Sequence, residues 1–473
     1  MMYSTFLGLE TALRALYAQR GAVEVAAHNV ANAHTPGYSR QVARLTTTSP
    51  LVPAGIPSAY PAWSMGTGVE LTNITRTRDA FLDRQSHVQG GYAGRYGAMD
   101  QILEQVEAYL MEPGSQGINA SLAAYWKAWQ DVGNDPTNLA ARRVLLQMAS
   151  SLGEDLAVLD QHWLAVQENV ARLLREDVDR FNALVAQVAQ LNRQVVAARL
   201  AGREPNDLLD QRDRLLDELS HLAPIRVQEG EAGEVSISVG GVAVLQGGHQ
   251  EILQVVEVDG LPQLRWQGLQ QDAAWIAEGG GRLGGLQDLG RYIVPGYRDQ
   301  LARMAQALAQ ETNQLHAQGF DLTGQPGGTF FVYTPPGPHS SLSLQVDPAL
   351  LSAPEKVAAA ASPSAGDGSH AFAMANLLDV PGKVGAGSIR DAYRSLVGQV
   401  GADRMEVKIR AENAEGLLRN IEYQRQSVEG VSLDEEVARI VQHQLGYQAA
   451  ARVITAIDEM ISTVVGRMGR AGL

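Results

Sequence analysis

Three glycines near the middle of the chain match the spacing of a dinucleotide-binding loop. Gly279, Gly281 and Gly284 follow the pattern G-x-G-x-x-G. Such a loop binds a pyrophosphate only where a strand precedes it, a helix begins on it, and a βαβ unit supplies an acidic residue about 20 positions on. Here a weak strand precedes the glycines, one long helical segment follows, and no parallel strand returns. The pattern therefore predicts a flexible turn, and we expect no cofactor.

The other residues that could do chemistry are scattered. His28 and His34 are six positions apart, so a helix would place them on different faces. The sequence contains no H-E-x-x-H, G-x-S-x-G or Walker-type segment. Acidic pairs such as Glu435 with Glu436 fit the solvent-facing sides of helices. We therefore predict no catalytic and no metal-binding residues, in a protein that is not an enzyme.

Composition limits the partners. The chain has 473 residues, with 38 Lys and Arg against 52 Asp and Glu, which gives a formal charge of 38 − 52 = −14. This balance disfavours nucleic acids and anionic membrane surfaces, because both attract basic faces. Cysteine is absent, which excludes disulfides, thiolate metal sites and cysteine nucleophiles. Its absence fits chance or a bacterial extracellular composition, or else a chain that crosses an export channel unfolded.

Membrane insertion is not expected. No run of about 18 uncharged apolar residues is present, which is the length that a transmembrane helix requires. The N-terminus lacks a basic region, and Glu10 and Arg14 interrupt its only apolar run, so it does not match a secretory signal peptide. We expect the first helix to stay in the mature chain.

The two ends of the chain share an apolar pattern with alternating spacings of three and four, as in coiled coils. The predicted assembly seam consists of Phe6, Leu9, Leu13, Leu16, Val23 and Val30 near the start, and Val437, Ile440, Tyr447, Ile454, Ile461 and Val465 near the end. Each stripe also holds polar residues: Arg20 in the first, Gln444 and Asp458 in the second. Polar residues in a seam fix register or partner number. The pattern favours packing between molecules, with closure within one molecule as the alternative.

The remaining sequence predicts a mainly α fold with a small all-β insertion, built as an elongated, nested helical bundle whose terminal helices pair. The longest helix is expected from Val158 to Val196, and an Asp-Gly turn at 259–260 indicates a hairpin. The expected domains are a terminal helical domain (1–40 with 430–473), a helical bundle with extended segments (41–224 with 277–429), and a β domain (225–276). A loop-rich stretch is expected from 319 to 387.

A turn is predicted directly after the first helix. Asn32 can take the left-handed conformation that ends helices, and Thr35-Pro36-Gly37-Tyr38 suits a type II turn because Gly at the third position supplies the positive φ. The stretch from 28 to 41 reads H-N-V-A-N-A-H-T-P-G-Y-S-R-Q. It resembles the signature of bacterial flagellar axial proteins, and its last four residues are most similar to the hook-associated protein 1 family of hook–filament junction subunits.

Further segments agree with this resemblance, in the same order along the chain. They are the motif turn residues Asn29, Asn32, Thr35, Pro36, Gly37, Tyr38 and Arg40, the segment 207–219 (D-L-L-D-Q-R-D-R-L-L-D-E-L), the segment 316–322 (H-A-Q-G-F-D-L) with 327–331 (G-G-T-F-F), and the C-terminal stretch 432–454. The matches span nearly the whole length. One departure is that many relatives are longer and carry an additional outer β domain.

The resemblance implies a structural subunit that is secreted through the flagellar type III apparatus and forms a ring between hook and filament. The implied partners are other copies of the chain, the hook protein, the second hook-associated junction protein and a cytoplasmic chaperone at the C-terminal region. No cofactor and no membrane insertion are implied. Another axial protein, of the hook or distal rod, is the alternative, and an intracellular enzyme or scaffold is a third class that no motif favours.

Overall fold

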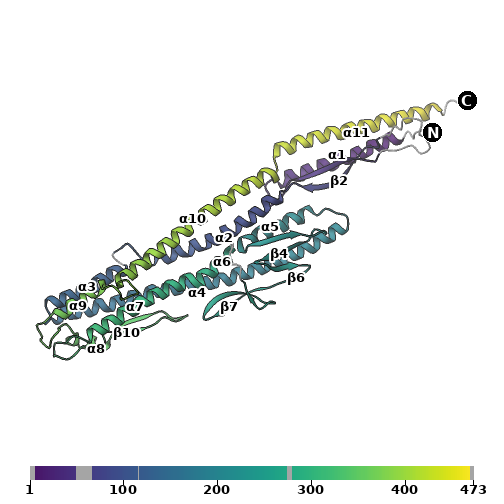
Figure 1. The fold of residues 1–473 in the computed structure, drawn as a ribbon. Helices are drawn as coiled ribbons and strands as arrows, with labels where there is room; N and C mark the ends of the chain where they lie inside the picture. Colours follow the sequence, from purple (N-terminus) through teal and green to yellow (C-terminus); the bar gives the residue numbers. More distant parts are fainter. Residues whose placement is uncertain (1–5, 50–65, 115–116, 274–279, 469–473) are drawn as a thin grey trace.

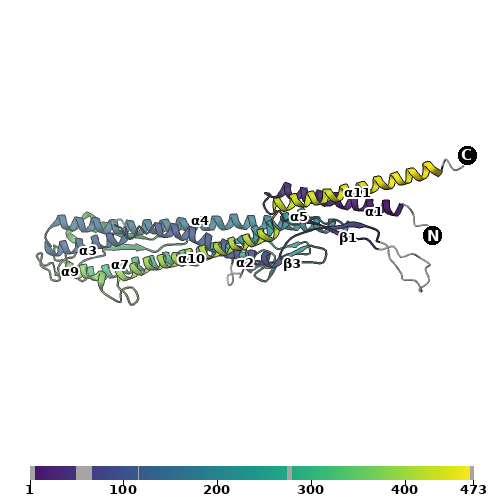
Figure 2. The same cartoon turned by 90° about the horizontal axis from the view of Figure 1, so that it is seen from above.

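The computed structural model describes residues 6–49, 66–114, 117–273 and 280–468. These residues form an elongated molecule in which long helices run side by side along most of the length (Figure 1). The first and last helices lie next to each other at one end, as Figure 2 also shows. The fold is mainly α with small antiparallel sheets, so the predicted fold class is confirmed.

Long helices dominate the chain. They are α1 (Phe6–Asn32), α2 (Ala80–Ala108), α3 (Ile118–Asn134), α4 (Leu139–Leu200), α5 (Asn206–Leu222), α6 (Gly281–Asp288), α7 (Val294–His316), α8 (Pro348–Ser352), α9 (Ser369–Asn376), α10 (Ile389–Glu429) and α11 (Leu433–Met468). The longest is α4, with 62 residues, so the predicted span from Val158 to Val196 was too short at both ends. It begins after Asn138, whose side-chain oxygen accepts hydrogen bonds from the amides of Ala140 and Ala141.

The part from α2 to α10, which we call the body, holds the main hydrophobic core. Along α10, buried residues spaced three and four apart pack toward α2. One ion pair is fully enclosed: Asp160 on α4 is 0% exposed and accepts a 2.7 Å hydrogen bond from Nε of Arg298 on α7. The other oxygen of Asp160 accepts from the Leu342 amide at 2.8 Å. These bonds tie two long helices to the segment after α7.

Two small sheets form the β insertion. A four-stranded sheet contains β3 (Ile225–Glu229), β4 (Val235–Val239), β5 (Val242–Gln246) and β6 (His249–Gln250), and a three-stranded sheet contains β7 (Leu253–Val258), β8 (Leu261–Trp266) and β9 (Gln271–Asp272). Asp259 and Gly260 both have positive φ, 57° and 74°, which confirms the predicted hairpin turn. Both sheets are attached to α4 by asparagine side chains: Asn182 bonds both backbone groups of Leu253, and Asn192 those of Val235.

The stretch from 319 to 387 contains more regular structure than its loop-rich sequence suggests. It includes the hairpin of β10 (Phe331–Thr334) and β11 (Ser343–Val346), the helices α8 and α9, and 3-10 turns at Pro354–Lys356 and Leu377–Asp379. A buried histidine holds two of its segments. His316 is 0% exposed, and its Nδ1 donates to the Gly328 carbonyl at 2.7 Å while Nε2 accepts from the Ala358 amide at 2.9 Å.

The glycine pattern that resembles a dinucleotide loop opens a short helix packed against α2 and α5. Gly281 starts α6 with φ +59°, and a Cβ there would lie 2.4 Å from the carbonyl oxygen of Leu222. A Cβ at Gly285 would lie 2.8 Å from the carbonyl oxygen of Arg95. Gly279 lies outside the described residues. The described glycines therefore permit close packing between helices.

The part formed by α1, α11, β1 (Gln41–Thr47) and β2 (Val69–Arg76), which we call the terminal unit, lies beyond the body (Figure 1). β1 and β2 pair antiparallel, and β2 packs on α1, where a Cβ at Gly21 would lie 2.9 Å from Leu71. Two short connections join this unit to the body: residues 77–79 between β2 and α2, and 430–432 between α10 and α11. Among the described helices, none is long and apolar enough to span a membrane.

We predict that His316 makes the protein less stable in acid. Burial lowers the pKa of this imidazole from 6.5 to about 4. Because the folded state favours the neutral ring, its contribution is complete above the unfolded pKa and is lost as the pH falls from about 6.5 to about 4, up to about 3 kcal/mol. The free energy of unfolding of the His316→Gln variant, measured over this range, should fall less than that of the native chain. Parallel pH curves would contradict the assignment.

Candidate functional site where the terminal helices meet the body

The end of α1 is fixed by one buried amide. Asn29 is 0% exposed, and its Oδ1 accepts hydrogen bonds from the Gln41 amide (2.9 Å) and the Tyr38 hydroxyl (2.7 Å). Its Nδ2 donates to the Gln41 carbonyl (2.8 Å) and to Oε2 of Glu436 (3.0 Å). All four hydrogen-bonding positions of the amide are therefore used, which offsets the cost of burying it. Asn29 links α1 to the turn, to β1 and to α11.

Glu436 is the acidic partner in this contact. The sequence pattern placed Glu435 and Glu436 on a solvent-facing side, and for Glu436 this was wrong: it is 1% exposed. Besides the bond from Asn29, its Oε1 accepts a 2.8 Å hydrogen bond from Nε of Arg40. The Glu435 side chain remains 65% exposed. The helical pattern of charges gives no sign of this burial, because the cation that pairs with Glu436 is Arg40, which lies 396 positions away in the sequence.

The motif turn has the predicted conformation. The Tyr38 amide donates to the Thr35 carbonyl at 3.2 Å, and Gly37 has φ 77°, as the third residue of a type II turn requires. Asn32 is the last residue of α1, but it does not have the predicted left-handed conformation. Its side chain closes the helix end instead: Nδ2 donates to the His28 carbonyl at 3.0 Å, and Oδ1 accepts from the Thr35 hydroxyl at 3.2 Å. Burial, assisted by nearby acidic residues, raises the pKa of Tyr38 above its ordinary value. Its hydroxyl therefore remains a donor to Asn29.

The start of α5 belongs to the body and contacts the residues that follow the motif turn. We call this region, where the terminal unit meets the body, the joint. Gln41 donates through its side chain to Asp207 at 3.0 Å, and the Ser39 amide donates to Asp210 at 3.2 Å. Asn206 donates to the carbonyl oxygen of Ile74 at 2.9 Å. The acidic residues of the 207–219 segment thus meet the backbone and side chains that follow the turn. The resemblance had identified this segment as a motif without identifying its contacts.

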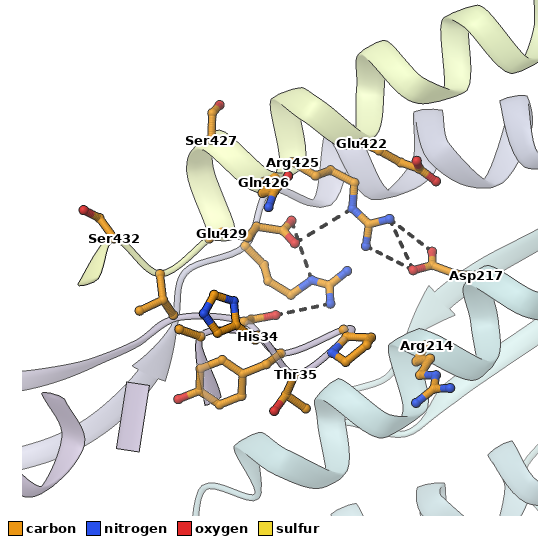
Figure 3. A pocket seen from close by; sticks show the side chains of 18 residues that line it. His34, Thr35, Arg214, Asp217, Glu422, Arg425, Gln426, Ser427, Glu429 and Ser432 are labelled. Atoms are coloured by element: carbon orange, nitrogen blue, oxygen red, sulfur yellow. Dashed lines mark hydrogen bonds and ion pairs between the residues drawn. The ribbon is translucent and has the colours of Figure 1, made fainter. Parts of the chain in front are cut away.

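A polar cleft of about 720 Å³ lies between the turn, α5 and the end of α10. Figure 3 shows Arg425 reaching from α10 toward Asp217 on α5 and Glu429 on its own helix. His34 and Thr35 line the cleft from the turn, and neither makes a metal site with its neighbours; no cluster of candidate metal ligands occurs among the described residues.

α1 and α11 lie side by side, and most of the buried apolar side chains on them are small. The buried apolar residues of the pair are Ala12, Ala18, Ala22, Val25, Ala26 and Ala450. At two glycines the approach is especially close: a Cβ at Gly8 would lie 3.3 Å from Ile457, and a Cβ at Gly446 would lie 3.0 Å from Gln19. His443 on α11 also bonds to Gln19 at 2.7 Å. An apolar groove of about 490 Å³, lined by residues of both helices, runs over this region.

The predicted seam residues lie on the same two helices, and some share the face of α11 that contacts α1: Ile454 is three positions before Ile457, which meets Gly8. None of them is buried: Phe6, Leu13, Val437, Tyr447 and Val465 are exposed, and Leu9, Leu16, Val23, Val30, Ile440, Ile454 and Ile461 are partly exposed. Tyr17, Val441, Leu445, Val453, Met460 and Val464 are also exposed. The buried apolar residues of the pair are thus mostly small, and many of the larger apolar side chains remain at least partly exposed. That these residues pack between molecules stays a prediction.

We predict that Glu436→Gln weakens the attachment of α11. A glutamine amide could accept from only one of Asn29 and Arg40, because its NH2 group would face the other, which is itself a donor, and Arg40 would lose its buried charge partner. We expect a loss of about 2 kcal/mol in the free energy of unfolding and faster hydrogen exchange in the first turns of α11. The matched control is Glu435→Gln, which removes an exposed charge and should change stability by less than about 0.5 kcal/mol. Equal effects of the two substitutions would contradict the account.

Comparisons with known proteins agree on one family. A family model described as the flagellar hook-associated protein FlgK helical domain matches residues 103–331. Models described as flagella basal body rod protein and flagellar basal body rod FlgEFG protein C-terminal match residues 9–38 and 420–467. The last two coincide with most of α1 plus the motif turn, and with most of α11 plus the end of α10.

Relatives that match over nearly the whole chain are named flagellar hook-associated protein 1. The chain is 31% identical to flagellar hook-associated protein 1 of Bacillus subtilis, with 100% of each chain covered, and 23% identical to that of Escherichia coli, with 97% and 99% covered. The solved structure of the flagellar hook junction protein FlgK from Burkholderia pseudomallei shares the fold, with a TM-score of 0.62 at 17% identity over 73% of this chain and 100% of that one. The chain therefore belongs to the flagellar hook-associated protein 1 family.

Proposed function

We propose that this chain assembles into the flagellum through the outward faces of α1 and α11. As a member of the hook-associated protein 1 family, it is a structural protein of the hook–filament junction. The observation that supports the assembly mode is the exposure of side chains in the terminal pair: the buried apolar residues are mostly small, and many large apolar residues are exposed. Contiguous apolar surface of this kind on a folded chain marks an interaction site.

The exposed apolar side chains would supply free energy for assembly when they become buried. Burying one large apolar side chain contributes about 1.5–3 kcal/mol. On α11 alone, Val437, Leu445 and Val465 are each more than half exposed, at 52%, 61% and 66%. Contacts of several such residues with neighbouring subunits offset the loss of translational freedom on assembly. The predicted seam residues are therefore proposed as the contacts between subunits.

The motif turn is proposed to set the position of this apolar surface. The residues that connect α1 to β1 and, through Glu436, to α11 are Asn29, Asn32, Thr35, Pro36, Gly37, Tyr38 and Arg40. The proposed axial domain comprises residues 1–40 and 430–473. Because β2 packs against α1, we propose that the hairpin of β1 and β2 moves with this domain.

The assembly partners and the export route of the chain are part of the same proposal. The chain is proposed to form a ring of its own copies, with the hook protein on one side and the second hook-associated protein on the other, outside the cell. Export through the flagellar type III apparatus suits a chain without cysteine, which cannot form cross-links while unfolded. A cytoplasmic chaperone would cover the apolar face of α11 before export. We propose a purely structural role, without catalysis.

A hook or distal-rod protein is the second candidate. Its support is limited to the terminal segments, which match models described for rod proteins. The middle of the chain matches the hook-associated helical domain instead. We infer that the terminal segments follow a packing mode common to axial proteins, while the body is specific to the junction.

Polar substitutions on the outward face should block assembly without unfolding the chain. We predict that the double variant Val437→Asp with Leu445→Asp keeps the native melting temperature within a few degrees, because both side chains are exposed. Its amount in sheared hook–filament material should fall at least tenfold. Gln448→Asp, also exposed on α11, is the matched control and should be incorporated normally. Normal incorporation of the double variant would disprove the proposed contact face.

The turn gives a second prediction. Gly37 has φ 77°, so Gly37→Val places a β-branched residue in the left-handed region, at a cost of about 1–2 kcal/mol. A Cβ at this position would lie 3.5 Å from Arg214, an ordinary contact, so the cost is conformational. We expect reduced incorporation for Gly37→Val and near-normal incorporation for Gly37→Asn, because asparagine tolerates positive φ. If both variants assemble equally well, positive φ is not what the turn requires.

A further inference from the structure

Polar contacts hold the segment between α7 and α10 to the end of α7. We call residues 317–388 the distal segment, because most of them lie toward the end of the molecule opposite the two termini (Figure 1). Asn313 in the last turn of α7 bonds the backbone of Phe330 and Phe331 through both ends of its amide, at 2.8 Å each. His316, the last residue of α7, bonds two stretches of the distal segment, at Gly328 and at Ala358. One helical turn therefore positions both stretches.

Both ring nitrogens of His316 are engaged, and only the neutral ring satisfies both partners. Nδ1 has to carry the proton, because it lies 2.7 Å from the carbonyl oxygen of Gly328, which can only accept. Nε2 has to accept, because it lies 2.9 Å from the amide nitrogen of Ala358, which can only donate. A second proton, on Nε2, would place two donors against each other and break the bond to Ala358, while the bond to Gly328 would survive. Protonation therefore acts on one of the two attached stretches.

The stretch that would lose its bond, residues 357–360, connects several parts of the distal end. Its four residues are buried, with exposures between 0 and 3%. It exchanges backbone hydrogen bonds with Phe320 after α7 and accepts one from the amide of Ala371 on α9. The carbonyl oxygen of Val357 accepts from the guanidinium of Arg142 on α4. Loss of the bond at Ala358 therefore weakens a stretch that contacts α4, α9 and the residues after α7.

A buried positive charge already lies on the other side of this stretch. Arg142 is 1% exposed, and its hydrogen bonds within the described residues go to the carbonyl oxygens of Pro136 and Val357. Burial lowers the pKa of Arg142 to about 10, so the guanidinium keeps its charge at neutral and acidic pH. A second positive charge on His316 would be repelled by it in surroundings that screen charges poorly.

The other groups around His316 compensate little of this charge. His370 on α9 supplies a second imidazole, and Asp321 in the loop after α7 supplies a carboxylate. From α3 and from the loop before β10, the ring meets Trp129 and Phe330, which are uncharged. Burial is the main cause that lowers the pKa of this histidine to about 4, and the two neighbouring basic groups lower it further.

We propose that His316 is an acid-sensitive latch, which releases residues 357–360 and the adjoining α9 when its Nε2 takes up a proton, while α3, α4 and α7 stay folded. The released stretch exposes buried backbone and apolar side chains at the distal end. No step involves α1 or α11, so this inference goes beyond the proposed function and can hold or fail independently of it.

Linkage gives the expected size of the effect. In the opened segment the imidazole meets water, where its pKa returns to about 6.5, so opening takes up one proton. Because the closed state holds the neutral ring, the latch is fully stabilising above about pH 6.5 and weakens as the pH falls toward 4. The equilibrium constant for opening should rise roughly 70-fold between pH 7.5 and pH 4.5.

Hydrogen exchange of the full chain, followed by mass spectrometry at pH 7.5 and pH 4.5, tests the latch. Exchange times are corrected for the pH dependence of the intrinsic rate. We expect the amides of residues 357–360 and Ala371 to lose protection at least tenfold at pH 4.5. The amides of Phe330 and Phe331, which bond Asn313, should keep their protection, as should those along the centre of α4.

Two variants show which histidine is responsible. His316→Gln takes up no proton in this range, so protection at 357–360 should be the same at both pH values, whatever its level at pH 7.5. His339→Gln is the matched control, because it removes an exposed histidine of the same segment, and it should keep the native pH dependence.

Four results would overturn the proposal. They are unchanged protection at 357–360 in the native chain, the native pH dependence in His316→Gln, loss of that dependence in His339→Gln, and an equal loss of protection along α4. The last result would mean that acid unfolds the body as a whole.

Discussion

The close approach of α1 and α11 is the constraint on which the rest of the molecule depends. Glycines at the contact leave room for longer side chains of the partner helix: Ile457 lies over Gly8, and Gln19 lies over Gly446, where an added Cβ would come within 3.3 and 3.0 Å of them. Many of the large apolar residues of both helices remain exposed. Alanine buries little apolar area, so the pair gains less from its own contact than two leucine-rich helices would. Under the proposed function, much of the apolar area of both helices is left for contacts between subunits.

Polar contacts supply the specificity that small residues lack. An alanine-lined interface can slide by a turn with little loss of packing, whereas a buried carboxylate tolerates only the register that supplies its partners. Glu436 meets Asn29 and Arg40 in a single register of α11 against α1. The same residues bind the start of β1, so the register of the helix pair and the position of the hairpin are fixed together.

Local features of the sequence gave reliable predictions, and contacts between distant segments did not. The turn at 35–38 and the hairpin at 259–260 depend on the φ preference of one or two residues, and both have the expected geometry. The helical pattern at both ends was also recognised, because period alone reveals it. The burial of Glu436 was missed because its partners lie in another part of the chain. The contacts of Asp207 and Asp210 were missed for the same reason, although their segment was recognised as a motif. Likewise, leucines rank above alanines as seam residues in any hydrophobicity pattern, yet alanines make up most of the buried apolar residues of this helix pair.

A polar joint has a further consequence for a chain that has to remain soluble before it assembles. The outward apolar face of α11 could fold back on the body only if the body offered a complementary apolar surface beside the joint. Instead, the end of α10 and the start of α5 present Arg425, Asp213 and Asp217 there. Burying these charges against apolar side chains would cost far more than the contact returns, because each would lose its ion-pair partners or water. These charges therefore disfavour collapse of the terminal unit onto the body, and under the proposed function the apolar face of α11 stays available for neighbouring subunits.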